Sequence, residues 1–216
     1  KVIAQARRDG QAIVALALAT QRATAVLWDT ATGRALVPAM VWQDTRYVDE
    51  LDRLAPAWNP RLLEQVGRPA GVRSPYLWAA RHLRDSPAVA QAWRERRLAF
   101  GTVDTWLLWH LTEERTYVTT ATNVTATGGL RLQDFTYHDE WIQAVGFPAE
   151  LLPELADDGA FHGTTRADIL GIRVPVTAVI GDQHGAIIGL GCIDAGSAMV
   201  VHGTGSFVDL VNGPDF

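Results

Sequence analysis

A carboxylate at the end of a predicted strand is the side chain in this sequence best placed to do chemistry. The apolar, β-branched run from Val174 to Ile180 is typical of a buried strand that ends at Gly181. Asp182 and Gln183 follow, and a helical pattern begins at Gly185. In open α/β sheets, ligands bind beyond the carboxyl ends of the strands. Asp182 is therefore either a general base or metal partner, or a helix N-cap that accepts hydrogen bonds from free amides.

A glycine-rich turn provides a second candidate. Gly203, Thr204 and Gly205 separate two predicted strands, Ser197 to His202 and Ser206 to Leu210. Two glycines let backbone amides approach an anion closely, and the Thr204 hydroxyl adds a donor, which predicts a phosphate-binding turn. A plain hairpin explains the same triplet and is its more frequent meaning.

Two further side chains end or follow predicted strands. Arg22 lies in a polar break after the apolar run from Ala12 to Ala19, and its planar fork of donors suits a substrate hydroxyl as well as a solvated loop. Trp42 ends the segment from Arg34 to Trp42. Its ring either walls a small polyol or packs in the core.

Composition narrows the classes of function. The chain has 216 residues, a formal net charge of -5 and a single cysteine. The charge predicts no nucleic-acid partner, and the apolar runs are too short for a membrane span of about 18 residues. One cysteine excludes an internal disulfide, which favours a cytoplasmic protein. The histidines show no zinc-type spacing, and no serine elbow predicts a hydrolase.

The elements that position these residues alternate between strands and helices. A meander is predicted at the start, with strands at 12–19, 25–29 and 34–42. Helices at 43–54, 60–66, 75–84 and 89–96 then form a helical insert at about 44–96. The remaining predictions are strands at 97–100 and 160–164 and helices at 103–111 and 138–145. The pattern predicts one α/β domain, and we expect a fragment truncated at both ends.

Five motifs in order carry a resemblance to a known family. The chain resembles the FGGY carbohydrate kinases, most closely the glycerol kinase branch. The motifs are Thr20-Gln-Arg-Ala-Thr, Val41-Trp-Gln-Asp-Thr-Arg46, Gly101-Thr-Val-Asp-Thr-Trp-Leu-Leu-Trp109, Gly181-Asp-Gln183 and Gly203-Thr-Gly-Ser-Phe207. The resemblance implies an actin-like, ribonuclease H-like ATPase fold. Residues 1–216 would be the substrate-binding first domain of a kinase that uses ATP and Mg²⁺.

The resemblance also implies roles for individual residues. Asp182 would be the catalytic base and an indirect partner of the metal, and Gln183 a polyol contact. Phe207 would pack on the carbon side of the polyol. The turn of Gly203, Thr204 and Gly205 would bind the phosphates of the nucleotide. The other implied polyol contacts are Arg22, Trp42 and Tyr76, of which Tyr76 is matched through a short Pro-Tyr pair alone.

Two departures from the family pattern bear on function. The Asp-x-Gly-Thr phosphate loop and the nucleotide-binding second domain are absent, so we expect the fragment alone to be inactive. Ala23 stands where glycerol kinases carry a glutamate that bonds a glycerol hydroxyl. We therefore expect phosphorylation of a small polyol or sugar, with a pentulose kinase or a non-catalytic sugar-sensing module as alternatives. Assembly into a homo-oligomer stays open.

Overall fold

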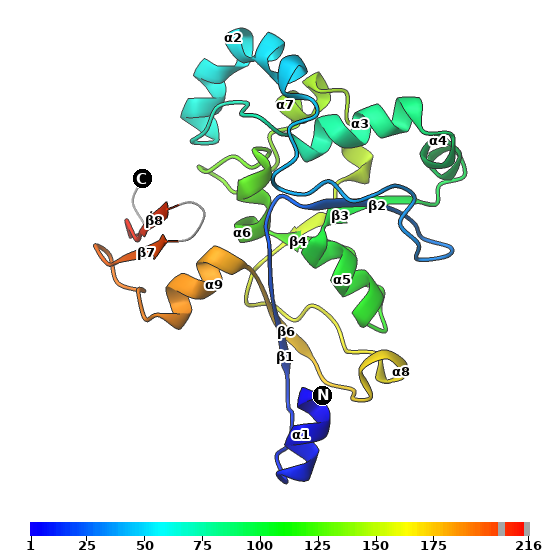
Figure 1. The fold of residues 1–216 in the computed structure, drawn as a ribbon, viewed down its shortest axis with the longest axis vertical. Coiled ribbons are helices and arrows are strands. Elements are labelled where there is room, and N and C mark those ends of the chain that lie inside the picture. The colour runs from blue at the N-terminus through cyan, green and yellow to red at the C-terminus, as the bar shows by residue number, and fades with distance from the viewer. Residues whose placement is uncertain (203–205, 214–216) are drawn as a thin grey trace.

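The first and last thirds of the chain meet in a parallel strand pair. The computed structural model describes residues 1–202 and 206–213. Strand β1 (Leu16–Thr20) pairs with β6 (Val176–Gly181), so that Thr20 lies opposite Gly181. Figure 1 shows the two strands side by side at the centre of the molecule. Because parallel strands end at the same edge, the segment after Thr20 lies beside Asp182.

The strand predicted at Ala12 to Ala19 is shorter and less buried than expected. It begins at Leu16, and Val14 is 76% exposed. Burial alternates along β1 because one face of the pair packs on the interior while the other stays open. β6 also alternates in part, rather than being buried throughout.

The predicted meander is wrong. Strand β2 (Ala25–Asp29) pairs antiparallel with β3 (Leu98–Thr102), and every residue of both strands is buried. The segment at 34–42 forms only isolated bridges to β2, Ala35 with Trp28 and Met40 with Ala25. Pro38 lies between those bridges and has no amide to donate, which is incompatible with a continuous ladder.

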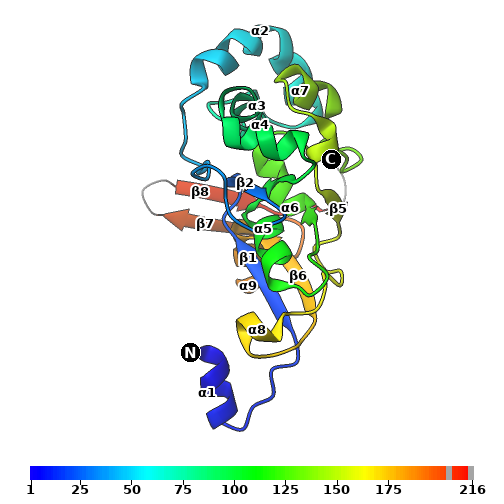
Figure 2. The same cartoon turned by 90° about the vertical axis from the view of Figure 1, so that its right-hand side faces the viewer.

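Helices between residues 48 and 94 pack above the β2–β3 pair (Figures 1 and 2). They are α2 (Val48–Gln65), α3 (Pro75–Asp85) and α4 (Pro87–Arg94). The two helices predicted at 43–54 and 60–66 are one, because α2 continues through Pro56 and Pro60. Leu51 and Leu62, at opposite ends of α2, are both buried in the main core, which offsets the amide donors that the prolines lack.

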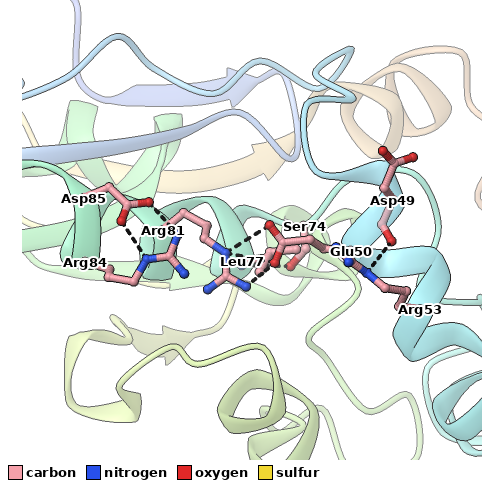
Figure 3. A network of polar contacts seen from close by, with 8 residues as sticks. All are labelled: Asp49, Glu50, Arg53, Ser74, Leu77, Arg81, Arg84 and Asp85. Carbon is pink, nitrogen blue, oxygen red and sulfur yellow. Dashed lines mark hydrogen bonds and ion pairs between the residues drawn. The ribbon is translucent and has the colours of Figure 1, made fainter.

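Polar contacts fix the relation of α2 to α3 (Figure 3). The Arg81 guanidinium on α3 forms a bidentate ion pair with the Glu50 carboxylate on α2. At the start of α3, the Ser74 hydroxyl oxygen accepts a hydrogen bond from the Leu77 amide at 3.2 Å, which caps the helix. The loop of residues 66–73 is therefore held between two anchored helices.

The remaining elements surround the central pair. The strand predicted at 160–164 is absent, and Thr164 makes only a bridge to Pro175. Thr102 is the N-cap residue of the helix predicted at 103–111, but its side chain accepts no capping hydrogen bond, and its hydroxyl donates to Asp104 at 2.5 Å. The other elements are α1 (Val2–Arg8), α5 (Val103–Leu111), β4 (Val118–Thr120), α6 (Ala121–Val124), η1 (Thr125–Thr127), α7 (Asp139–Ala144), η2 (Ala149–Leu151), β5 (Glu154–Ala156), α8 (Ala167–Leu170), α9 (Asp182–Gly189), β7 (Ala198–His202) and β8 (Ser206–Leu210).

The core lies mainly between the helices and the β2–β3 pair. Trp78 on α3 and Trp141 on α7 are fully buried in it, together with Phe100 on β3. Trp28 faces the opposite side of β2 and packs against Trp109 on α5. In the described part of the chain, no helix is long and apolar enough to cross a membrane.

Candidate functional site

A large pocket opens at the carboxyl end of the β1–β6 pair. Its volume is about 740 Å³, within the usual range for small-molecule sites. Predicted residues from distant parts of the chain line it together: Arg22, Trp42, Asp182, Gln183 and Phe207. The pairing of β1 with β6 is the reason that Arg22 and Asp182 meet.

The interpretation of Asp182 as a helix N-cap is wrong, because Gly181 holds that position and α9 has no side-chain capping hydrogen bond. Asp182 is the first residue of α9, and its Oδ1 accepts a hydrogen bond from the Gln183 amide at 2.9 Å. Its side chain is nevertheless 53% exposed, and Arg22 Nε lies 4.0 Å from Oδ1. The helix amide orients the carboxylate, and the carboxylate remains accessible to a ligand in the pocket.

Gly181 allows this close approach. A Cβ at this position would lie 2.5 Å from Arg22 Cδ and 2.9 Å from the Thr122 carbonyl oxygen. Its amide donates to Thr122 Oγ1 at 3.0 Å. Gly181 has an ordinary φ of -65°, so the requirement for glycine is steric rather than conformational.

Trp42 and Phe207 are apolar walls of the pocket. They are 41% and 46% exposed, which excludes the interpretation of Trp42 as a core residue. Two hydrogen bonds between Ala25 and Met40 hold the segment that carries Trp42 against β2. Phe207 comes from the β7–β8 hairpin. Such rings can cover the carbon side of a polyhydroxylated ligand.

Tyr76 does not line this pocket. It is 2% exposed, packs against Phe100 and Phe147, and its hydroxyl pairs with Thr127 Oγ1 at 2.8 Å. Burial raises the pKa of Tyr76 well above its usual range. The Pro-Tyr pair that suggested a ligand contact is the first turn of α3, whose buried face carries Tyr76 into the core. The turn of Gly203, Thr204 and Gly205 lies outside the described residues.

Sequence reasoning missed three charged residues of the pocket. Arg68 and Arg73 come from the loop between α2 and α3, and Asp209 comes from β8. Gly67 and Gly71 are the sequence signal that this segment is a loop rich in turns. In the structure their φ values are 73° and 72°. Periodicity does not indicate which pocket such a loop faces.

The pocket is more positive than the chain as a whole. Three guanidinium groups line it, against the carboxylates of Asp182 and Asp209. Burial lowers the pKa of Arg22, Arg68 and Arg73 from the usual value. The guanidinium charges persist at neutral pH and act in surroundings that screen them less than water does.

The described residues contain no group of three or more His, Cys, Asp or Glu side chains that could hold a metal ion. Mg²⁺ is commonly bound by one or two protein carboxylates together with substrate phosphates. Asp182, with an accessible carboxylate, fits the indirect role expected from the sequence.

Comparisons with known proteins agree with this arrangement. A family model described as the FGGY family of carbohydrate kinases, N-terminal domain, matches residues 1–189. The glycerol kinase of Alcanivorax borkumensis is 35% identical over 217 residues, covering 99% of this chain and 43% of that protein. The glycerol kinase of Thermus brockianus is 36% identical over 215 residues, covering 96% and 43%. The chain therefore spans less than half the length of these relatives.

Solved structures show the same fold. A structure of Plasmodium falciparum glycerol kinase with ADP superposes with a TM-score of 0.85 at 24% identity, covering 96% of this chain and 42% of that one. A structure described as a xyloylose kinase from Brucella ovis gives a TM-score of 0.79 at 23% identity, with the same coverage. The fold is the actin-like, ribonuclease H-like one, and the chain belongs to the FGGY family of carbohydrate kinases.

Proposed function

We propose that this chain is the substrate-binding first domain of a kinase that transfers a phosphoryl group from ATP to a hydroxyl of a small polyol or sugar. The observation that carries the proposal is the meeting of Asp182 and Arg22 in one pocket, at the carboxyl end of the β1–β6 pair. The family membership supports the reaction class.

Asp182 acts as the base in this proposal. An acceptor hydroxyl oxygen attacks the γ-phosphorus, the bond from that phosphorus to the ADP oxygen breaks, and the hydroxyl proton passes to the Asp182 carboxylate. The hydrogen bond from the Gln183 amide fixes Oδ1, which leaves Oδ2 to receive the proton. Mg²⁺, when bound with the nucleotide, would neutralise phosphate charge.

The other pocket residues position the acceptor. Arg22 donates to acceptor oxygens from beside the base, and Gly181 leaves room for its alkyl part because a Cβ there would lie 2.5 Å from Arg22 Cδ. Trp42 and Phe207 cover apolar carbon atoms of the acceptor and exclude water from them. The turn of Gly203, Thr204 and Gly205 would hold the transferred phosphoryl group, as the family resemblance implies.

The test is Asp182→Asn in the full-length protein, because the amide preserves the shape of the side chain but cannot accept the proton. We expect turnover to fall about 10²-fold or more, with acceptor affinity nearly unchanged. Steady-state kinetics and calorimetric binding measure the two effects. The matched control is Asp52→Asn on α2, an exposed aspartate that does not line the pocket. Near-normal turnover in Asp182→Asn would overturn the assignment of the base.

A further inference from the structure

Two pocket arginines lack an acidic partner. Arg68 and Arg73 are both half-buried, and among the described residues neither forms an ion pair. Arg68 Nη1 donates to the Ala126 carbonyl at 2.6 Å, whereas Arg73 Nε is buried without any hydrogen-bond partner. A guanidinium nitrogen that is buried without a hydrogen-bond partner is costly, so its retention in a pocket favours a ligand that accepts a hydrogen bond from it.

The other arginines make the contrast clear. Those that are half-buried in the described structure, such as Arg81 and Arg97, pair with carboxylates. Those without a carboxylate partner, such as Arg34 and Arg53, are exposed to water. Among the residues that the structure describes, Arg68 and Arg73 alone combine partial burial with the lack of a carboxylate.

The loop that carries these arginines is held in place. The Asn59 side-chain oxygen on α2 accepts a hydrogen bond from the Ala70 amide at 2.9 Å. The contact of Arg68 with Ala126 joins the loop to the segment after α6. The guanidinium groups are thus presented by a fixed loop, which lowers the cost of ordering them around a ligand.

The charges of Arg22, Arg68 and Arg73 repel one another. Arg73 lies close enough to both of the others to act on their ionisation. Asp182 and Asp209 both act on the ionisation of Arg22, whereas no carboxylate of the described residues acts on that of Arg68 or Arg73, so these two are left to an incoming anion. The planar fork of a guanidinium matches a carboxylate or a phosphate. Two sources of that anion exist in a kinase: the acceptor itself and the phosphates of the nucleotide.

We propose that Arg68 and Arg73 form a subsite for a carboxylate on the acceptor, so that the preferred substrate is a polyhydroxy acid with one hydroxyl at Asp182. This proposal rests on the proposed kinase function. The pocket of about 740 Å³ has room for an acceptor longer than three carbons. Ala23, which lines the same pocket, adds no negative charge that would repel the acid.

The test compares matched acceptors that differ at one terminal carbon, which is a carboxylate in the acid and a primary alcohol in the polyol. Full-length enzyme is assayed by ADP release with gluconate against sorbitol, and with glycerate against glycerol. We expect kcat/KM to favour the acid of each pair by at least about tenfold, as a hydrogen bond to a charged group permits. Arg73→Gln is expected to lower the acid-to-polyol ratio by about ten- to a hundredfold. Arg73→Lys keeps the charge without the fork and is expected to lie between.

Controls separate the possible outcomes. Arg53→Gln, an exposed arginine of α2 that does not line the pocket, should leave the acid-to-polyol ratio unchanged. A higher KM for ATP in Arg73→Gln, without a change in that ratio, would assign the arginines to the nucleotide and overturn the proposal. Activity restricted to uncharged acceptors would also overturn it while leaving the kinase function intact.

A full-length protein that phosphorylates none of these acceptors would contradict the proposed function. In that case, a binding measurement tests the carboxylate subsite separately. Calorimetry with gluconate and sorbitol measures it without any chemical step. Gluconate binding that Arg73→Gln abolishes would support the subsite. Equal binding of the two compounds, or no binding of either, would exclude it.

Discussion

Ala23 lines the pocket with a backbone φ of 56°, in the left-handed region that residues with a Cβ adopt uncommonly. The residue is only 1% exposed, so it is packed into the pocket wall and reaches little of the open cavity. Gly181 defines the opposite constraint, because no side chain fits between Arg22 and Thr122. At both positions we expect a larger side chain to change how a ligand binds, and each substitution can be tested directly.

Ala23→Glu is expected to improve the use of glycerol. The family resemblance implies a glutamate at this position in glycerol kinases, and a hydrogen bond to a charged group contributes roughly 1.5 to 3 kcal/mol. The apparent KM for glycerol should therefore fall by about ten- to a hundredfold in the full-length protein. Both residues carry a Cβ, so the substitution adds no new backbone strain. Steady-state kinetics showing strong glycerol preference in the wild type, with no gain in the variant, would contradict this expectation.

Gly181→Ala is expected to move the Arg22 guanidinium away from the Asp182 carboxylate. The added methyl would overlap Arg22 Cδ and the Thr122 carbonyl, and overpacking of this kind costs about 1 to 3 kcal/mol. We expect lower stability together with weaker acceptor binding, measured by thermal unfolding and calorimetry. Gly159→Ala is the control, because nothing lies within 4 Å of a Cβ there. Equal behaviour of the two variants would show that the site absorbs the methyl group.

At the scale of elements, the ion pair of Glu50 with Arg81 determines how α2 and α3 meet around the arginine loop (Figure 3). Both side chains are about a quarter exposed, at 27% and 25%. The hydrogen bond from Arg81 holds the pKa of Glu50 below its usual range. The pair therefore stabilises the fold above the unfolded-state pKa of about 4.3, and this contribution disappears as the pH falls through the lower folded-state value.

Glu50→Gln is expected to lower the free energy of unfolding by about 0.5 to 1 kcal/mol at pH 7, as for partly exposed pairs. The difference from wild type should begin to shrink as the pH falls below about 4.3 and should vanish only at a low pH, beneath the folded-state pKa of Glu50, where the wild-type carboxylate is protonated. Urea unfolding at both pH values measures this, with Glu64→Gln on the exposed side of α2 as the control. A difference that persists at low pH would indicate that packing, not charge, is responsible.

The elements also show how far the sequence could be interpreted. The strand at Val174 to Ile180 and the helix beginning beside Asp182 were predictable, because apolar runs and glycine mark local boundaries. The partner of β1 was not, because pairing depends on contacts far along the chain. Tyr76 failed as a site residue for a related reason: a two-residue motif does not indicate which helix face is buried. Arg68 and Arg73 lay in a loop, where periodicity carries no information.

At the scale of the whole molecule, the chain supplies one side of a proposed reaction. It spans 43% of the Alcanivorax borkumensis and Thermus brockianus glycerol kinases. Several apolar residues at the end of α9 and on β8 are exposed, including Ile188 at 58%, Leu190 at 67% and Val208 at 70%. Exposed apolar surface of this kind is typical of a face that another segment or protein covers.

The chain alone is expected to show no ATP-dependent phosphorylation of any polyol or sugar, because the proposed nucleotide-binding half is not among its residues. The measurement is product formation with purified chain, beside the full-length protein at equal concentration. If the purified chain, free of contaminating kinase, formed phosphorylated product, the proposal that a second domain binds the nucleotide would be contradicted. Acceptor binding by the chain, measured by calorimetry, is independent of that result.

The parallel pairing of β1 with β6 has a consequence for how the site comes into being. Arg22 is synthesised well before Asp182, and most of residues 1–216 lie between them. Closing so long a loop costs entropy before any contact compensates it, so such pairs form slowly. The helices and the β2–β3 pair can assemble from nearer neighbours first. We therefore expect the pocket to form late in folding, and a nascent chain that stops before Gly181 to have much of the core but not the candidate site.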